Sequence, residues 1–165
     1  MKWKVPHISK VYEAPGAIAD HRILRGPAEG GGGLVTAKVY SSSRGKFYDV
    51  TYGADKNAIM SNDNSAYWKG ELGYPAIALL MQLGVLSFDK GIAESLKGIA
   101  WKDINQKHKN DFDKTVQDVL AHVDSLGPQG VKSGDVVRFC ESVLSKIEHW
   151  NLGLLGKKQR PPAGY

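Results

Sequence analysis

The stretch LVTAKVYSSSRGKFYDVTY, residues 34–52, decides the fold that we expect for this chain. Its first part alternates, with Leu34, Thr36 and Lys38 on one side of an extended strand and the residues between them on the other. Its last part, KFYDVTY, is rich in β-branched and aromatic residues, and SSSRG in between supplies turn residues. We therefore predict a β-hairpin over residues 34–52, followed by a third short strand at residues 58–61.

Beyond the hairpin, the apolar period changes to that of helices. The segment YPAIALLMQL, which begins at residue 74, has a proline at an early helical position, is apolar on almost every side and stops at Gly84, as is typical of a buried helix. Apolar stripes predict further helices over residues 88–98, 101–126 and 133–152. Strands followed by helices indicate an α+β fold, in which a small antiparallel sheet of about residues 34–61 is covered by one helix and precedes a helical C-terminal half.

The length of 165 residues fits one domain, residues 1–165. Within it we distinguish an irregular N-terminal segment (1–33), the hairpin with its buried helix (34–87), a helical part (88–152) and a mobile basic tail (153–165). Residues 10–19 are left open between a strand and a helical turn, because Pro15 and Gly16 interrupt both periods. The glycine run at residues 30–33 predicts a loop.

The composition excludes several classes of protein. Cys140 is the one cysteine, so neither an intramolecular disulfide framework nor a multi-thiolate zinc site can form, and its place on an apolar helical stripe predicts core packing. The longest apolar stretch is too short to cross a bilayer, so we expect no membrane partner and a cytoplasmic location. We also expect no cofactor, no metal and no catalytic residues.

The net charge of +5 comes from the two ends of the chain, because its middle is slightly acidic. Clustered lysine and arginine are typical of proteins that bind polyanions, and aromatic rings beside cations can stack on unpaired bases. We therefore predict a non-enzymatic binding or adaptor module whose basic surface binds DNA or RNA. The residues expected to make this contact are Trp3, Arg44, Lys46, Trp68, Lys69, Lys157, Lys158 and Arg160, with Lys2, Lys4, Arg22 and Arg25 extending the positive surface.

Two other functions stay open. A protein-interaction subunit would dock a larger partner through its basic tail or an exposed apolar patch. An enzyme, hydrolase-like or metal-dependent, would use His108 and Asp111, which lie three residues apart on the expected 101–126 helix and would share one of its faces.

Residues 34–82 resemble the ββα unit of SWIM-type zinc fingers. The likeness rests on the hairpin KVYSSSRGKFYDVTY, the turn after AIMSND and the helix that opens GYPAIALLM. The zinc ligands of that family would fall near residues 60–63 and on Tyr74 and Ala76, and none of these positions holds Cys or His. The resemblance therefore implies a unit held by packing instead of metal, with an association with DNA and with other proteins.

Overall fold

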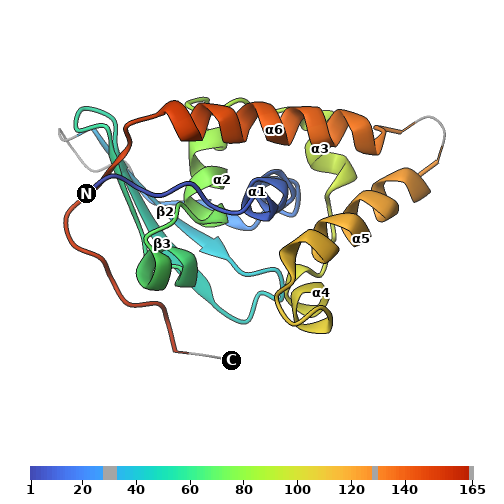
Figure 1. Ribbon diagram of the computed structural model, residues 1–165. Coiled ribbons are helices and arrows are strands. Elements are labelled where there is room, and N and C mark those ends of the chain that lie inside the picture. The colour runs from blue at the N-terminus through green and yellow to red at the C-terminus, as the bar shows by residue number, and fades with distance from the viewer. Residues whose placement is uncertain (28–32, 128–129, 164–165) are drawn as a thin grey trace.

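The computed structural model describes residues 1–27, 33–127 and 130–163, and in this part of the chain a sheet is packed against several helices (Figure 1). The α+β class expected from the sequence is confirmed. The elements are α1 (Ser9–Ala19), β1 (Ile23–Arg25), β2 (Leu34–Tyr40), β3 (Phe47–Gly53), β4 (Ala58–Ser61), the π-helical turn η1 (Ser65–Lys69), α2 (Tyr74–Gln82), α3 (Lys90–Ser95), α4 (Trp101–Lys107), α5 (Phe112–Ser125), α6 (Ser133–His149) and β5 (Gly153–Leu154).

The predicted hairpin and the third strand are both confirmed. Strands β2 and β3 pair antiparallel from Leu34 opposite Gly53 to Tyr40 opposite Phe47, and β4 pairs antiparallel with β3. Within the described residues, two short strands that the sequence did not predict complete a five-stranded sheet in the order β1-β2-β3-β4-β5. The first, β1, pairs antiparallel with β2, and β5 pairs parallel with β4.

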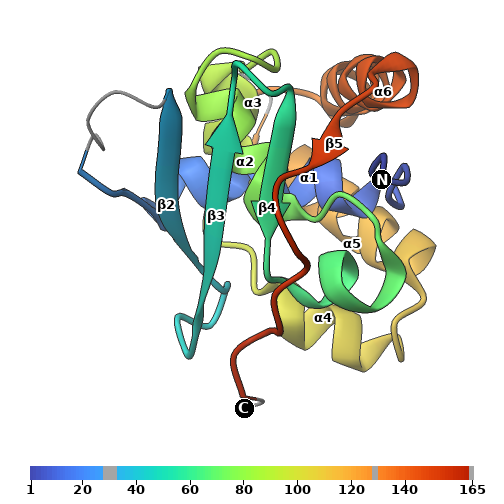
Figure 2. The same ribbon diagram turned by 90° about the vertical axis from the view of Figure 1, so that its left-hand side faces the viewer.

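The helices cover one face of the sheet (Figures 1 and 2). Alternate residues of the strands, among them Val39, Val50 and Ile59, are buried on that face. Against them lies α2, whose residues from Pro75 to Met81 are all buried, as predicted for a helix that is apolar on every side. The C-terminal segment runs from β5 past the end of β4, along that edge of the sheet (Figure 2).

Residues 9–19, which the sequence left open between strand and helical turn, form the central helix α1. Nine of its eleven residues are buried, and Pro15 lies inside it. A proline in the interior of a helix removes one hydrogen bond, but burial on every side supplies packing that outweighs this local preference. At its start, the backbone N–H of Ser9 donates to Nδ1 of His7 at 3.1 Å.

The single helix predicted over residues 101–126 is wrong, because the chain breaks it into α4 and α5. Lys109 and Asn110, between the two helices, have positive φ angles of 53° and 63°. Asp111 caps α5, its side chain accepting the backbone N–H of Lys114. Asparagine tolerates the left-handed region and aspartate is a favoured N-cap, so the polar stretch KHKND ends one helix and starts the next.

The C-terminal part differs from the expected tail. Helix α6 ends at His149, before the predicted residue 152, and the first two residues of the expected mobile tail form β5.

The expected glycine loop falls mostly on residues 28–32, outside the described residues, and the N-terminal segment expected to be irregular contains α1 and β1. In the described residues, no helix has both the length and the apolar character needed to cross a membrane.

Candidate ligand-binding site

The tip of the β2–β3 hairpin, residues 41–46, packs against the start of α4. The turn is closed by the backbone N–H of Ser41, which donates to the carbonyl of Lys46 at 2.9 Å, and by that of Arg44, which donates to the carbonyl of Ser41 at 2.9 Å. From the tip, Oγ of Ser42 accepts the backbone N–H of Lys102 at 3.2 Å. A loop between two strands is thus fixed against a helix that comes 60 residues later in the chain.

A cavity of about 330 Å³ lies where the hairpin tip, α1, α2 and α4 meet. We call it the tip cavity. Its lining is mainly polar and aromatic, and comes from segments far apart in the sequence. The lining residues are Lys10, Glu13, Ser41, Ser42, Lys46, Tyr48, Asn64, Tyr74, Trp101, Lys102, Asn105, Gln106 and Asn110.

Two residues that line the tip cavity each carry a buried polar atom that finds no hydrogen-bond partner among the described residues. These atoms are the indole Nε1 of Trp101, whose side chain is only 2% exposed, and Oδ1 of Asn105. Buried polar atoms in proteins are nearly always paired, so each exception calls for an explanation. The two residues lie four apart in α4 and therefore share one face of that helix.

Buried charges lie beside the tip cavity. Glu13 of α1 is 5% exposed, and its Oε1 lies 3.9 Å from Nη1 of Arg22, which is 1% exposed. Burial raises the pKa of the Glu13 carboxyl, against the opposing effects of Lys10 and Arg22.

Burial likewise raises the pKa of Asp63, which accepts hydrogen bonds from Oγ of Ser61 and from a backbone N–H. Burial also raises the pKa of Tyr74, whose ring lies edge-on to Tyr48 with 6.3 Å between centroids.

Glu13→Gln is expected to flatten the dependence of folding stability on pH. An acid whose pKa is higher in the folded chain stabilises the fold fully below its ordinary value of 4.5, and this contribution is lost as the pH rises through the higher, folded-state value. The amide keeps the shape of the side chain without the charge. Urea denaturation from pH 4.5 to pH 8 should therefore show a smaller fall in the free energy of unfolding than in the wild type.

A matched control for this change is Glu94→Gln, which alters an exposed carboxyl on α3. It should leave the pH profile of the wild type nearly unchanged. A Glu13→Gln profile that is as steep as the wild type would show that folding does not raise the pKa of Glu13, and a steeper one would show that the surroundings stabilise its carboxylate.

The structure brings some of the predicted contact residues to this end of the molecule. Lys46 lines the tip cavity, and Arg44 donates from Nη2 to the carbonyl of Asp20 at 2.6 Å. Lys69 lies over the ring of Phe112, 5.6 Å from its centroid, and Lys10 lies over the same ring at 4.7 Å. Lys69 and Lys10 are therefore joined through one aromatic side chain.

The other predicted contacts lie along η1 and the C-terminal segment. Trp68 is 71% exposed and packs edge-on against Tyr67, and Nζ of Lys158 donates to the carbonyl of Tyr67 at 3.4 Å. Lys157 and Arg160 are exposed in the same segment. In Figure 2 this segment runs from β5 toward the end of the molecule that carries α4 and the hairpin tip.

Two of the expected surface residues are instead buried, and these expectations are wrong. Trp3 is 5% exposed, and its indole N–H donates to the carbonyl of Ile59 at 3.0 Å, so its ring cannot stack on a base. Arg22 is 1% exposed and lies among Glu13, Asp20 and the ring of Tyr74. Lysines on either side made Trp3 look exposed, but the indole fills the core under β4.

His108 and Asp111 do not form the expected pair, because the helix that would have aligned them ends at Lys107. Nε2 of His108 lies 2.7 Å from Oδ2 of Asp118 on α5, and this contact lowers the pKa of Asp118. The described residues contain no group of three or more His, Cys, Asp or Glu side chains placed to hold a metal.

Cys140 is fully buried, which confirms its predicted place in the core, and burial raises the pKa of its thiol.

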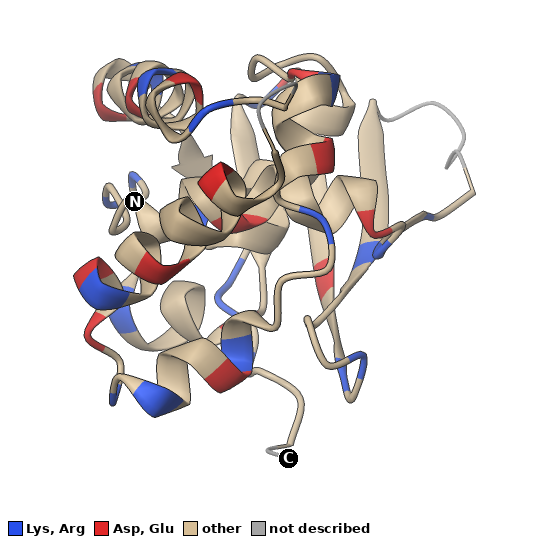
Figure 3. Ribbon diagram, turned by 90° about the vertical axis from the view of Figure 1, so that its right-hand side faces the viewer, with Lys and Arg blue, Asp and Glu red and all other residues tan. Residues whose placement is uncertain are grey.

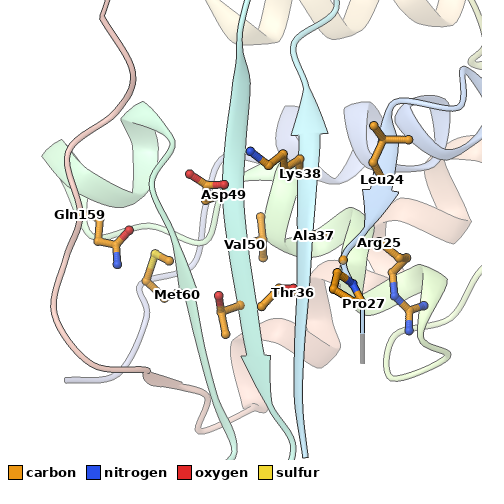
Figure 4. Close-up of a pocket in the computed structure, with 12 residues that line it drawn as sticks. Leu24, Arg25, Pro27, Thr36, Ala37, Lys38, Asp49, Val50, Met60 and Gln159 are labelled. Carbon is orange, nitrogen blue, oxygen red and sulfur yellow. The ribbon is translucent and has the colours of Figure 1, made fainter. Parts of the chain in front are cut away.

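A larger cavity of about 440 Å³ lies on the outer face of the sheet, with the C-terminal segment at one side of it (Figure 4). Figure 4 shows Lys38 and Asp49 on neighbouring strands, with Met60 and Gln159 toward the side of the C-terminal segment. No atom among those found buried and unpaired in the described residues belongs to its lining. We therefore take the tip cavity as the candidate site.

Comparison with protein families places the chain in one of them. Residues 3–153 match the family described as uncharacterised conserved protein UCP014422, and the chain belongs to this family. Comparison with the curated proteins and with the solved structures gave no match.

Among the residues of the tip cavity that sequence reasoning missed are Lys10, Glu13, Lys102 and Asn105. Lys10 and Glu13 lie in the segment whose structure stayed open, so no face could be assigned to them. Trp101 is buried at the start of the helix predicted over residues 101–126, but the state of its indole N–H cannot be read from a periodic pattern. A polar Asn four residues after a buried Trp was the one signal available.

Proposed function

We propose that this protein is a non-enzymatic binding module that holds nucleic acid by its phosphates at the end formed by the hairpin tip and α4. In Figure 3, lysine and arginine positions gather at the hairpin tip and on α4, which lie at the same end of the molecule. Contacts of this type fix the position of a nucleic acid without reading its sequence.

The observation that carries the proposal is the convergence of three lysines on one cavity. Lys10 comes from α1, Lys46 from the segment that leads into β3, and Lys102 from α4, and all three line the tip cavity. Arg44 at the adjacent tip and Lys109, just after the end of α4, are exposed and extend the positive surface. Lysine clustered on one face is the electrostatic footprint of polyanion binding.

The charges of the buried carboxyls favour the same assignment. A carboxylate facing the cavity would repel a phosphate. Because burial raises the pKa of Glu13, its carboxyl stays neutral to a higher pH than an exposed glutamate does, and over that range it does not repel a phosphate. The hydroxyls of Ser41 and Ser42, also in the lining, add short polar groups of the kind that contact phosphate oxygens.

Replacing Lys46 and Lys102 together by alanine is expected to weaken binding to single-stranded oligonucleotides by about tenfold or more at low salt, to a similar degree for every sequence. Removing one lysine–phosphate contact should lower the slope of log affinity against log salt by about 0.7 for a single strand. Fluorescence anisotropy titrations of labelled single- and double-stranded oligonucleotides, repeated over a series of salt concentrations, measure both quantities.

The matched control replaces Lys56 and Lys90, two exposed lysines in the β3–β4 turn and at the start of α3, so that the net charge changes equally. Figure 2 shows both places at the opposite end of the molecule from α4. Equal losses of affinity in the two double variants would mean that only the overall charge matters. Absence of binding by the wild type to any oligonucleotide at low salt would reject the proposal.

A further inference from the structure

The tip cavity is a built polar site of the size that one small planar group requires. Its volume of about 330 Å³ is at the lower end of the range of ligand pockets, which are mostly apolar with a few polar groups that fix orientation. Rings of Tyr48, Tyr74 and Trp101 contribute to its lining. Stacking on aromatic side chains is the usual way in which proteins hold an unpaired base.

The unpaired polar atoms define what such a group must offer. The indole Nε1–H of Trp101 can only donate, and Oδ1 of Asn105 can only accept. A partner for both must offer an acceptor to the first and a donor to the second, and the two residues lie on the same face of α4. The Watson–Crick edges of nucleobases carry this pattern of neighbouring donors and acceptors, and in single strands these edges are free.

The cations complete the pattern expected for a nucleotide. Lys10, Lys46 and Lys102 line the same cavity as the donor and acceptor on α4. A base in the cavity would therefore carry its phosphate close to three positive charges. An uncharged planar ligand would gain nothing from them, so the lining favours a planar group that bears an anion.

From this geometry we infer that the tip cavity holds one unpaired nucleobase, with its edge hydrogen-bonded to Trp101 Nε1–H and Asn105 Oδ1 and its phosphate beside the three lysines. The inference rests on the proposed function, since it names the part of the nucleic acid that enters the site. It gives a reason for two buried polar atoms that stay unpaired within the described part of the free protein. It also implies that single strands bind better than duplexes, in which this edge of the base is already paired.

The test uses the full chain, nucleoside monophosphates of the four bases, ribose 5-phosphate and two single-stranded oligonucleotides that differ by abasic positions. Trp101→Phe keeps an aromatic ring but removes the indole N–H, and Asn105→Ala removes the acceptor. Each change should weaken binding of at least one nucleoside monophosphate by about tenfold, the usual effect of one hydrogen bond, in calorimetric titrations. Affinity for ribose 5-phosphate should stay the same.

The matched control is Trp150→Phe, because the indole N–H of Trp150 donates to Oδ1 of Asn57 at 2.9 Å, outside the cavity. This variant should bind every probe as the wild type does. Thermal melting of each variant identifies any loss of fold, and Asn105→Ala provides a second readout if Trp101→Phe is unstable.

The outcomes separate this inference from the proposed function. If abasic and intact oligonucleotides bind equally, and monophosphates bind no better than ribose 5-phosphate, the base does not enter the cavity and the inference is overturned, while phosphate binding stands. If monophosphates bind through Trp101 and Asn105 but no oligonucleotide binds at low salt, the cavity takes a base as inferred and the nucleic-acid proposal is the one that fails.

Discussion

Gly16→Ala is expected to lower the free energy of unfolding by about 2 to 3 kcal/mol, the usual cost of overfilling a packed interior. Gly16 lies in α1, where that helix meets the end of α3. A Cβ added there would lie 2.5 Å from the carbonyl oxygen of Leu96 and 3.4 Å from its Cβ. The first of these atoms belongs to the backbone, so it cannot move aside as the end of a long side chain would.

Helix propensity alone predicts that Gly16→Ala stabilises the protein, so a loss of stability would report the close packing of α1 against Leu96. Alanine inside a helix is ordinarily favoured over glycine by about 0.5 to 1 kcal/mol. The control Gly134→Ala, near the start of α6, places its Cβ no closer than 3.4 Å to the flexible guanidinium of Arg138 and should be neutral or stabilising. Urea denaturation compares the two. A Gly16→Ala protein as stable as the wild type would mean that α1 and α3 are not in close contact.

Arg22→Met is expected to cost about 3 to 5 kcal/mol, because it removes the cation from a buried charged group and leaves its partners behind. Nη1 of Arg22 donates to the carbonyl of Tyr40 at 3.1 Å and lies 3.9 Å from Oε1 of Glu13, and Nε lies 3.8 Å from Oδ2 of Asp20. Methionine fills similar space but offers neither the charge nor the donor. Chemical denaturation at pH 7 measures the fall in the free energy of unfolding.

Two further variants isolate the charge from the shape. Arg25→Met changes an exposed arginine of β1 and should stay within about 0.5 kcal/mol of the wild type. Adding Glu13→Gln to Arg22→Met should recover part of the stability, since the carboxyl no longer needs a counter-ion. A double variant whose effects simply add would show that the two groups do not interact.

The sheet was predictable to the extent that it depends on local pattern. Alternation over residues 34–52 is sufficient to set the hairpin, because a shift of register by one residue would turn Ala37 and Val39 toward solvent. Strands β1 and β5 are too short to produce such a pattern, and both form only because a longer neighbour offers free backbone groups. The central helix α1 was missed since Pro15 and Gly16 oppose it locally, and only burial from every side makes it favourable.

The candidate site was predicted in part, at the hairpin tip. Turn chemistry and two cations pointed to Arg44 and Lys46, and Lys46 lines the cavity. The remaining residues of the cavity come together only through the packing of α1, α2 and α4 against the hairpin tip. An apolar stripe in the sequence shows which face of a helix is buried, but it does not show which element packs against that face. The break between α4 and α5 shows the same limit, because apolar positions kept their spacing on both sides of residues 108–111 while the direction of the chain changed.

The contacts between the two ends of the described chain have a consequence for the order in which this fold can be completed. The backbone N–H of Trp3 donates to the carbonyl of Leu152 at 3.0 Å, and that of Leu154 donates to the carbonyl of Met1 at 2.9 Å. These bonds can form only after Leu152 and Leu154 have left the ribosome, so the open edge of β4 stays uncovered until then. Contacts between residues so far apart in the sequence form slowly, so the hydrogen bonds between the two ends of the chain should form late in folding. A nascent chain halted before Leu152 would expose the edge of β4, which could pair with other chains.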